Sequence, residues 1–334
     1  MTAPLLEIEN LSVSFPTGKG GRATVVRDLS YRLDAGETLA VVGESGSGKS
    51  VHALALAGLL DPAARIDSGV VRFAGRDLLQ LDPAALRDIR GREIGFVFQD
   101  PMTSLNPVLS IGRQLAEPLT RHLGLKGGAL RRRLVELLEL VGVDRAEQRL
   151  KQFPHQLSGG QRQRVMIAIG VACNPRLLIA DEATTALDVT VQAQIVDLLR
   201  DLKARLGLTL LWISHDLGVV ARLADTVQVM YAGGVVESGP VDAVFHDTRN
   251  AYTLGLLRSL PEGASGGRLQ AIPGQPPDPA ALSPGDPFAP RNCWATARCH
   301  VERPPLRQAE DAADGHLVAA WYDLRRILAE EVRP

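Results

Sequence analysis

The chain has 334 residues, of which 45% are hydrophobic, and a formal net charge of -1 at pH 7. This apolar content is enough for a well-buried core, and the length predicts two or more structural units. The near-neutral charge and an aromatic content of only 4% argue against a nucleic-acid binder, which is usually basic or offers aromatic side chains for base stacking.

The start of the chain, MTAPLLEIEN, has no basic region followed by an apolar one, so we do not expect a secretory signal. The longest apolar stretch, at 53–60, is far shorter than the about 20 residues that span a bilayer. Any membrane role is therefore expected to be peripheral. The three cysteines, Cys173, Cys293 and Cys299, lack the spacing of a disulfide framework, which favours a reducing, cytoplasmic setting.

The first strands are predicted at 5–9, 11–15 and 29–33, where every second side chain is apolar. The continuous apolar run at 38–42 is typical of a strand that is buried on both faces, as in a parallel sheet. This run leads directly into a glycine-rich loop, and helix-forming residues follow from 51 to 60.

The glycine-rich loop matches the Walker A pattern for phosphate binding. Its glycines allow the backbone to curl so that successive N–H groups face phosphate oxygens, and the following helix adds the positive end of its dipole. Lys49 is predicted to reach the β- and γ-phosphates of ATP, and the Ser50 hydroxyl to bind Mg²⁺. The predicted ATP-binding residues are Gly43, Glu44, Ser45, Gly46, Ser47, Gly48, Lys49 and Ser50.

The segment from about 100 to 173 has a helical pattern, with amphipathic helices predicted at 111–122 and 130–141. Beyond it, strands and helices alternate, which predicts an α/β core with a parallel sheet. The helix of this part is predicted at 191–205. Its strands are predicted at 177–180, 208–213 and 226–231.

Two acidic residues follow the predicted strand at 177–180, in the arrangement called Walker B. Asp181 is predicted to hold the Mg²⁺ shell, and Glu182 to polarise the attacking water as a general base. Acidic pairs at strand ends are common on protein surfaces, so this assignment depends on the Walker A loop upstream.

The composition changes after about residue 244. The stretch 261–290 is rich in proline and glycine, which predicts an extended, irregular tail instead of a packed domain core. A short amphipathic helix is predicted at 317–331, near the end of the chain.

The pentapeptide LSGGQ at 157–161 precedes a predicted helix at 162–171. A serine and two glycines at a helix start form a second anion site, with Ser158 as the N-cap. LSGGQ is the signature sequence of ABC ATPases, and the chain resembles that family. In the family, the signature of one subunit completes the Walker A site of another. The resemblance therefore implies a head-to-tail dimer, with residues that act on the partner's ATP: Ser158, Gly159, Gly160, Gln161 and Asp188.

The resemblance also implies roles for single residues. Gln99 matches the Q-loop glutamine, which contacts Mg²⁺ and water, and His215 matches the switch histidine, which contacts the γ-phosphate. Asp188 ends the D-loop sequence at 186–188. The implied catalytic residues are Glu182, His215 and Gln99, and the implied Mg²⁺ ligands are Ser50, Gln99 and Asp181.

Two roles are equally consistent with the position of Phe15. It is a candidate for stacking on the adenine ring, or it is a core side chain of its strand.

Longer segments resemble the ATP-binding subunits of peptide importers, in particular 98–107, 215–220, 272–277 and 287–291. The resemblance implies an ATPase with ATP and Mg²⁺ as cofactors that powers uptake of dipeptides or oligopeptides. Nickel or another small solute is the alternative cargo. The implied partners are two transmembrane permeases, a second and paralogous ATPase, and an extracytoplasmic solute-binding protein, with no nucleic acid. The implied location is peripheral, on the cytoplasmic face of the cell membrane.

The chain departs from this family at two places. Ala183 replaces the usual proline after Walker B, which leaves the catalytic carboxylate in place. Many relatives carry four cysteines in the tail, and some hold an iron–sulfur cluster. The corresponding positions here are Asp286, Asn292, Cys299 and Ala320, with Cys293 beside the second. Because a [4Fe–4S] cluster normally needs four thiolates, no cluster is expected.

The predicted fold is an α/β P-loop NTPase of the ABC ATPase type. Residues 1–99 and 174–245 are predicted to form the catalytic core with an N-terminal β-subdomain, 100–173 a helical signature subdomain, and 246–334 a C-terminal extension of the peptide-importer type. The rival hypothesis is an ABC ATPase of DNA repair or translation. It is disfavoured because the segment between Ser50 and Glu182 has no sustained heptads and the chain has only one cassette.

Overall fold

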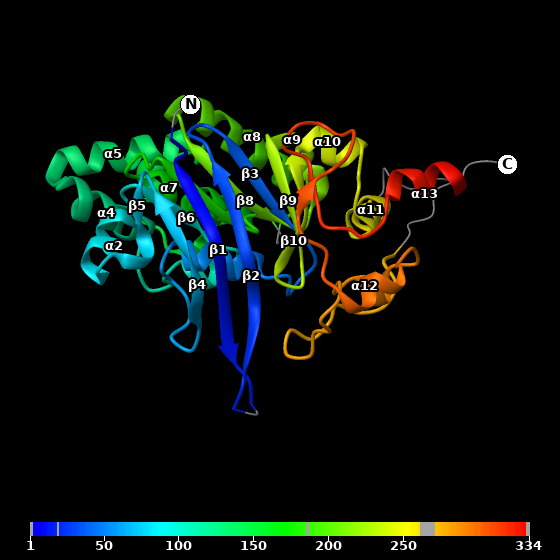
Figure 1. Ribbon diagram of the computed structural model, residues 1–334. Coiled ribbons are helices and arrows are strands. Elements are labelled where there is room, and N and C mark those ends of the chain that lie inside the picture. The colour runs from blue at the N-terminus through cyan, green and yellow to red at the C-terminus, as the bar shows by residue number, and fades with distance from the viewer. Residues whose placement is uncertain (1–2, 19, 185–186, 261–270, 332–334) are drawn as a thin grey trace. The chain divides into compact units, whose positions relative to one another are not determined.

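The computed structural model describes residues 3–18, 20–184, 187–260 and 271–331 (Figure 1). The chain divides into two compact units. The first comprises residues up to 32, 39–77 and those from 214 on, and the second comprises 33–38 and 78–213. The division into a catalytic core, a helical subdomain and an extension that the sequence suggests stays a prediction. No helix of the described residues is long and apolar enough to cross a membrane.

A four-stranded sheet forms one part of the first unit, in the order β2-β1-β4-β5. Leu6 of β1 pairs with Phe73 of β4 in antiparallel register. The sequence predicted two strands where β1 is continuous, because the break near Asn10 is only a register shift, with Asn10 at a φ of 49°. The strands are β1 (Leu6–Pro16), β2 (Arg22–Leu33), β4 (Arg65–Phe73) and β5 (Arg76–Asp77).

A second sheet of the structure has eight strands. Five of them lie in the first unit, in the order β11-β12-β10-β9-β3. β3 (Thr38–Val42) pairs in parallel with β9 (Thr226–Tyr231). All five side chains of β3 are buried, as expected for a central strand. β10 (Gly234–Pro240) returns antiparallel to β9. The helices of this part are α1 (Lys49–Leu56), α9 (Leu217–Leu223), α10 (Val241–His246) and α11 (Ala251–Arg258).

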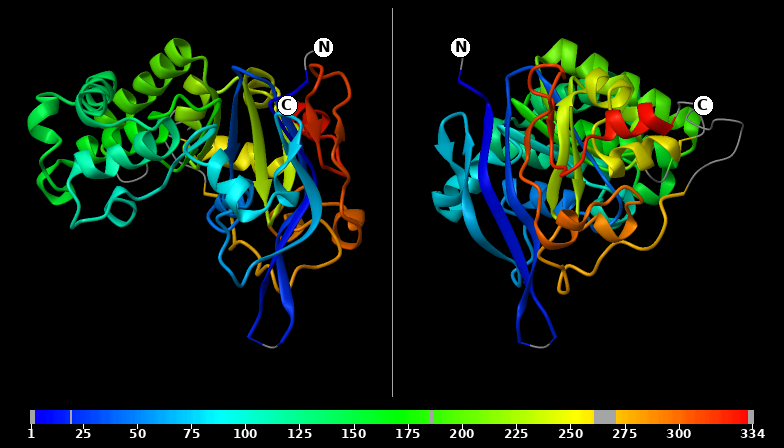
Figure 2. Two further views of the ribbon diagram at one scale, coloured as in Figure 1. Left: turned by 90° about the vertical axis from the view of Figure 1, so that its left-hand side faces the viewer. Right: turned by 45° about the vertical axis from the view of Figure 1, so that its right-hand side comes forward.

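In the proline-rich stretch, residues 271–288 form no helix or strand, as the sequence predicted. The C-terminal extension is nevertheless packed, which corrects the expectation that it lacks a packed core. Phe288, Cys299 and His316 are buried in the first unit. The predicted helix at 317–331 is also wrong in its first part, because residues 317 and 318 pair with β10 as a strand. Figure 2 shows the C-terminal part of the chain, coloured orange to red, from two further directions. The extension contains α12 (Ala297–Val301), β11 (Arg307–Gln308), β12 (Leu317–Val318) and α13 (Leu324–Glu331).

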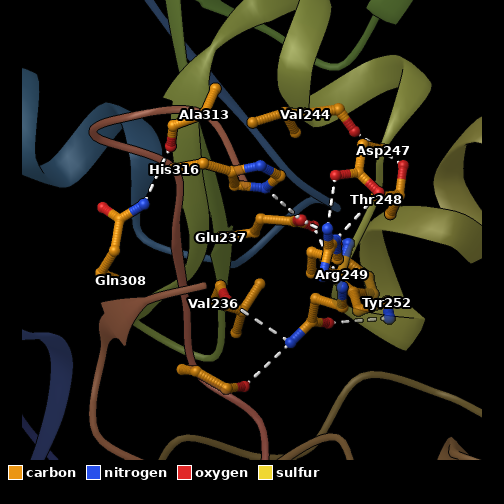
Figure 3. Close-up of polar contacts among 12 residues, drawn as sticks. Val236, Glu237, Val244, Asp247, Thr248, Arg249, Tyr252, Gln308, Ala313 and His316 are labelled. Carbon is orange, nitrogen blue, oxygen red and sulfur yellow. Dashed lines mark hydrogen bonds and ion pairs between the residues drawn. The ribbon is translucent and has the colours of Figure 1, made fainter. Parts of the chain in front are cut away.

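A buried carboxylate anchors the extension to the core of the first unit (Figure 3). Glu237 of β10 accepts hydrogen bonds from the backbone N–H groups of Arg249 (2.6 Å) and Asn250 (3.3 Å). Its Oε1 also lies 2.8 Å from Nε2 of His316. The Asn250 side chain donates to the carbonyl of Ala319 at 2.9 Å. These hydrogen bonds join β10, the start of α11 and the extension, and they therefore hold the extension against β10.

The second unit contains three parallel strands, in the order β8-β7-β6. They are β6 (Ile94–Val97), β7 (Leu177–Asp181) and β8 (Thr209–Ser214). Helices and parallel strands confirm the predicted α/β class, and the predicted segments at 111–122, 130–141 and 191–205 are helical. The helices of this unit are α2 (Pro83–Ile89), α3 (Pro101–Ser104), α4 (Ile111–Leu123), α5 (Gly127–Leu140), α6 (Ala146–Arg149), α7 (Gly159–Val171) and α8 (Val189–Leu206).

Candidate nucleotide-binding site

The glycine-rich loop lies between β3 and α1, as the sequence predicted. Gly48 has a φ of 97° and caps α1, and a Cβ at this position would lie 2.5 Å from the carbonyl oxygen of Val25. At Gly43, with a φ of 151°, a Cβ would overlap the carbonyl of Met230. Both positions therefore require glycine, because other residues would meet backbone strain and a backbone clash at once.

Lys49 folds back over the loop. Its buried ammonium donates to the carbonyl oxygens of Gly43 (2.7 Å) and Glu44 (3.0 Å). The positive charge therefore lies inside the curled loop, at the N-terminus of α1, where a helix attracts anions. This arrangement fits the phosphate groups of a nucleotide.

The turn between β9 and β10 supports the loop from another side. The N–H of Gly233 donates to the carbonyl of Ser47 at 3.1 Å, and the carbonyl of Gly233 accepts from the N–H of Arg27 at 2.7 Å. Within the loop, the N–H of Ser47 donates to the carbonyl of Glu44 at 3.2 Å. One backbone hydrogen bond thus joins the loop to a turn that is distant in sequence, and another stabilises the loop internally.

A buried histidine lies behind the loop on α1. His52 is inaccessible to solvent, and its Nε2 lies 3.2 Å from the hydroxyl of Tyr31 on β2. Burial lowers the pKa of His52 to about 4, and the nearby charge of Lys49 also lowers it. His52 is therefore neutral near pH 7 and packs as a core residue.

The loop has two further partners that the sequence did not indicate. The Tyr252 hydroxyl accepts the N–H of Glu44 at 2.7 Å, and the Arg291 guanidinium pairs with the Glu44 carboxylate. Both partners come from beyond residue 250, and no local pattern connects them to the loop.

In the second unit, the structure brings two of the predicted catalytic residues together. Asp181 is the buried last residue of β7, and Glu182 follows it. The Glu182 carboxylate accepts a hydrogen bond of 3.0 Å from the Gln99 amide, just after β6. Glu182 has a φ of 46°, held by its N–H bond of 2.9 Å to Ile213. Such strain in a residue other than glycine is typical of functional sites.

The signature sequence begins α7, as predicted, with Ser158 as its N-cap. The Ser158 hydroxyl accepts from the N–H of Gln161 at 3.3 Å, and the Gln161 side chain accepts from the N–H of Ser158 at 3.1 Å. Asp188 caps the neighbouring helix α8 through the N–H of Val191 at 2.9 Å. A Cβ at Gly159 would lie 3.8 Å from Cδ2 of Leu187, so the signature and the D-loop are adjacent. Ala186 of the D-loop, like Pro261 in the tail, lies outside the described residues.

His215 and Phe15 belong to the first unit, together with the Walker A loop. His215 is exposed directly after β8, and the next residue, Asp216, caps α9 by accepting the N–H of Gly218 at 2.9 Å. Phe15 is half-buried near the end of β1, and therefore lies outside the fully buried core.

The cysteines of the extension are free thiols, Cys293 exposed and Cys299 buried. Cys299 contacts the Thr296 hydroxyl at 3.3 Å, and its carbonyl accepts the N–H of Asp286 at 2.8 Å. Burial raises the pKa of the Asp286 carboxyl. Within the described ranges, no group of three or more histidine, cysteine and acidic side chains is placed to hold a metal ion.

Comparison with known protein families gives two matches. Residues 26–185 match the ABC transporter family. Residues 236–299 match the C-terminal region of oligopeptide and dipeptide transporters, which includes Tyr252 and Arg291.

Individual relatives agree with these matches. The chain is 49% identical over 320 residues to the oligopeptide transport ATP-binding protein OppD of Bacillus subtilis, covering 95% of this chain and 88% of that one. Among solved structures, a dimeric post-hydrolysis state of the ATP-binding cassette MJ0796 with ADP and Pi has a TM-score of 0.64 at 29% identity, over 71% of this chain and 98% of that one. CbiO1 of Clostridium perfringens, part of the ABC transporter complex cbiONQ, has a TM-score of 0.62 at 27% identity, over 74% and 92%.

Proposed function

The chain belongs to the ABC transporter family, among its peptide-transport ATP-binding proteins, and on that premise we propose that it hydrolyses ATP to power peptide uptake through membrane permeases. The observation that carries the proposal is the joint presence of a nucleotide-binding loop, a capped signature helix and the C-terminal region of peptide transporters in one chain. As an ABC ATPase, the chain binds ATP through this loop.

The candidate Mg²⁺ ligands are the hydroxyl of Ser50, the carboxylate of Asp181 and the amide oxygen of Gln99. All three are hard oxygen donors, which Mg²⁺ prefers, and Asp181 ends a strand as such a ligand does in P-loop proteins. When bound, Mg²⁺ neutralises negative charge on the β- and γ-phosphates. The positive charge of Lys49 inside the loop acts in the same sense.

Hydrolysis requires a group that takes a proton from the attacking water. Glu182 is proposed for this role, because its carboxylate follows β7 directly and its backbone is held in a strained conformation. Gln99 donates to that carboxylate and thereby orients it, and His215 is proposed to contact the γ-phosphate.

The signature residues Ser158, Gly159, Gly160 and Gln161, with Asp188, are proposed to complete the ATP site of a second, paralogous ATPase subunit. ATP held between two subunits favours the closed dimer, and hydrolysis removes that bridge.

The two subunits are proposed to work at the cytoplasmic face of the membrane, on two permeases that receive cargo from a solute-binding protein. The segment after Gln99 is proposed to dock on the permeases. Its apolar side chains are unusually exposed, 54% for Met102 and 76% for Val108, which is typical of a surface that another protein covers.

The test is to purify the chain with its permeases and ATPase partner in lipid nanodiscs and to measure ATP turnover. The solute-binding protein is added with dipeptides, with oligopeptides or with a nickel complex. Stimulation of turnover by peptides alone supports the proposal. Stimulation by the nickel complex alone would show that nickel, and not peptide, is the cargo. A complex that hydrolyses no ATP would refute the proposed function as a whole.

A further inference from the structure

Glu44, the second residue of the Walker A loop, is bound by the C-terminal extension. The Arg291 guanidinium forms two parallel hydrogen bonds with its carboxylate, from Nη1 to Oε2 at 2.6 Å and from Nη2 to Oε1 at 3.0 Å. Such bidentate, charge-assisted pairs are among the strongest hydrogen bonds in proteins and fix both groups in orientation as well as distance.

The guanidinium is itself held rigidly. Its Nη1 donates to the Tyr231 hydroxyl at 3.1 Å, and its Nε donates to the carbonyl of Pro273 at 2.7 Å. It also lies against the rings of Tyr231 and Phe288, whose centroids are 5.7 and 5.8 Å from its central carbon. Only 6% of the Arg291 side chain is exposed, against 25% for Glu44. A salt bridge this buried is screened far less by solvent than a surface pair.

A second residue of the extension binds the backbone of Glu44. The Tyr252 hydroxyl accepts the Glu44 N–H at 2.7 Å, and its ring packs against Tyr231, with centroids 4.6 Å apart. Tyr252 lies in the first turn of α11, which Asn250 caps through the N–H of Tyr252 at 2.9 Å. Asn250 belongs to the buried network of Glu237 shown in Figure 3, so the position of Tyr252 is fixed by the core of the first unit.

Glu44 thus connects the extension to the phosphate-binding groups. While its carboxylate binds Arg291 and its N–H binds Tyr252, its carbonyl accepts from the ammonium of Lys49 and from the N–H of Ser47. Any movement of Glu44 would therefore move a hydrogen-bond acceptor of the lysine that faces the phosphates.

We propose that Arg291 and Tyr252 are positioning residues for ATP binding: they hold Glu44, and through it the Walker A loop, in the conformation that binds phosphate. The C-terminal extension is then part of the nucleotide site's support, beyond any role in transport. The inference rests on ATP binding by residues 43–50, as proposed above, and is independent of the cargo.

The test compares ATP affinity of the full chain and its variants. Arg291→Gln removes the ion pair, Arg291→Lys keeps the charge without the planar fork, and Tyr252→Phe removes only a hydroxyl. The matched control is Arg326→Gln on α13, whose pair with Glu330 is exposed (77% and 58%) and does not contact the loop. Equilibrium titration gives the dissociation constant for Mg-ATP, and thermal unfolding shows that each variant is folded at the titration temperature.

We expect Arg291→Gln to weaken ATP binding about tenfold, since losing one charged partner leaves the other half-buried and unpaired. Arg291→Lys should recover part of this loss, and Arg326→Gln should bind as the wild type does. In steady state, the KM for ATP should rise more than kcat falls, because saturating ATP restores the loop conformation. Adding Glu44→Gln to Arg291→Gln should cost little more, because both act on one contact.

A purely structural pair would lower the melting temperature and leave ATP affinity unchanged. Folded Arg291→Gln and Tyr252→Phe variants that bind ATP within about twofold of the wild type would therefore overturn the inference. If Arg291→Gln does not fold, Arg291→Lys and Tyr252→Phe decide the matter, with an expected loss of at least threefold in one of them. A wild-type chain without ATP affinity would instead refute the proposed function.

Hydrogen exchange gives a second readout without nucleotide. Peptides that cover 43–50 should exchange faster in Arg291→Gln than in Arg326→Gln, while peptides from α7 should be equal in both. Equal exchange in the loop would count against a positioning role.

Discussion

Gly95 on β6 and Gly170 on α7 allow the signature helix to approach the sheet of the second unit closely. A Cβ at Gly95 would overlap the carbonyl oxygen of Gly170 and lie 3.0 Å from Cδ1 of Leu178. The overlapping atom is backbone, so it cannot rotate away as the end of a flexible side chain could. Replacing Gly95 with alanine therefore requires α7 and β6 to separate.

The expected cost follows from that geometry. Apolar carbon atoms pack at about 3.5–4.0 Å, so α7 must move by roughly 1 Å or the strand must distort. Overpacking of a core costs typically 1–3 kcal/mol, and a backbone clash belongs at the upper end. We expect Gly95→Ala to reduce the free energy of unfolding of the second unit by about 3 kcal/mol. ATP turnover should also fall, because the helix that must move begins with the signature.

Gly128, in the same unit, offers a control in which the same substitution is expected to raise the free energy of unfolding. It lies in the first turn of α5, and a Cβ there would meet only the flexible end of Arg132, at 3.7 Å. Because alanine restricts the unfolded chain and favours helix, Gly128→Ala should stabilise the unit by about 0.5 kcal/mol. The same chemical change is thus predicted to act in opposite directions at two positions.

The measurement is urea unfolding of the two variants and the wild type, followed by tryptophan fluorescence through Trp212, which is buried in β8 of this unit. A lower midpoint for Gly95→Ala and an equal or higher one for Gly128→Ala, with unchanged slopes, is the expected result. If Gly95→Ala unfolds at the wild-type midpoint, the packing argument for α7 and β6 is wrong.

Three further predictions concern single side chains. Glu182→Gln should bind Mg-ATP normally but turn it over at least about a hundredfold more slowly in single-turnover assays, and unchanged turnover would remove Glu182 from its role. Lys49→Ala should weaken ATP binding in equilibrium titrations, and a normal affinity would count heavily against the loop as a phosphate site. Burial raises the pKa of Asp286, so its ionised form destabilises the fold as pH rises through that pKa. Asp286→Asn should therefore melt higher than the wild type at pH 7.5, with the gain shrinking towards pH 4, and an equal gain at both pH values would contradict this sign.

The amphipathic pattern at 317–331 shows how sequence reasoning fails here. The pattern fits a helix, yet residues 317 and 318 pair with β10, and the helix begins only at Leu324. A two-residue strand carries too little periodicity to be recognised, and its partner lies about eighty residues earlier. The prolines of the tail also predicted irregular backbone correctly in part, but they gave no sign that Phe288 and His316 would be buried.

The sequence by itself determined the elements whose chemistry is contiguous. The Walker A loop, the signature with its Ser158 cap and the acidic pair at the end of β7 each lie within a few residues, because backbone curl, helix capping and strand ends are local properties. These motifs sufficed to predict the α/β fold and the ATPase.

Only the tertiary structure decided what supports those motifs. Glu44 and Arg291 are 247 positions apart, and the Arg291 side chain reaches Glu44 only once the extension has packed within the first unit. The close approach of Gly95 to Gly170 is likewise a property of two folded elements. Contacts of this kind join residues that are far apart in the sequence and become neighbours only when the chain folds. No spacing of residues along the sequence indicates such a pair.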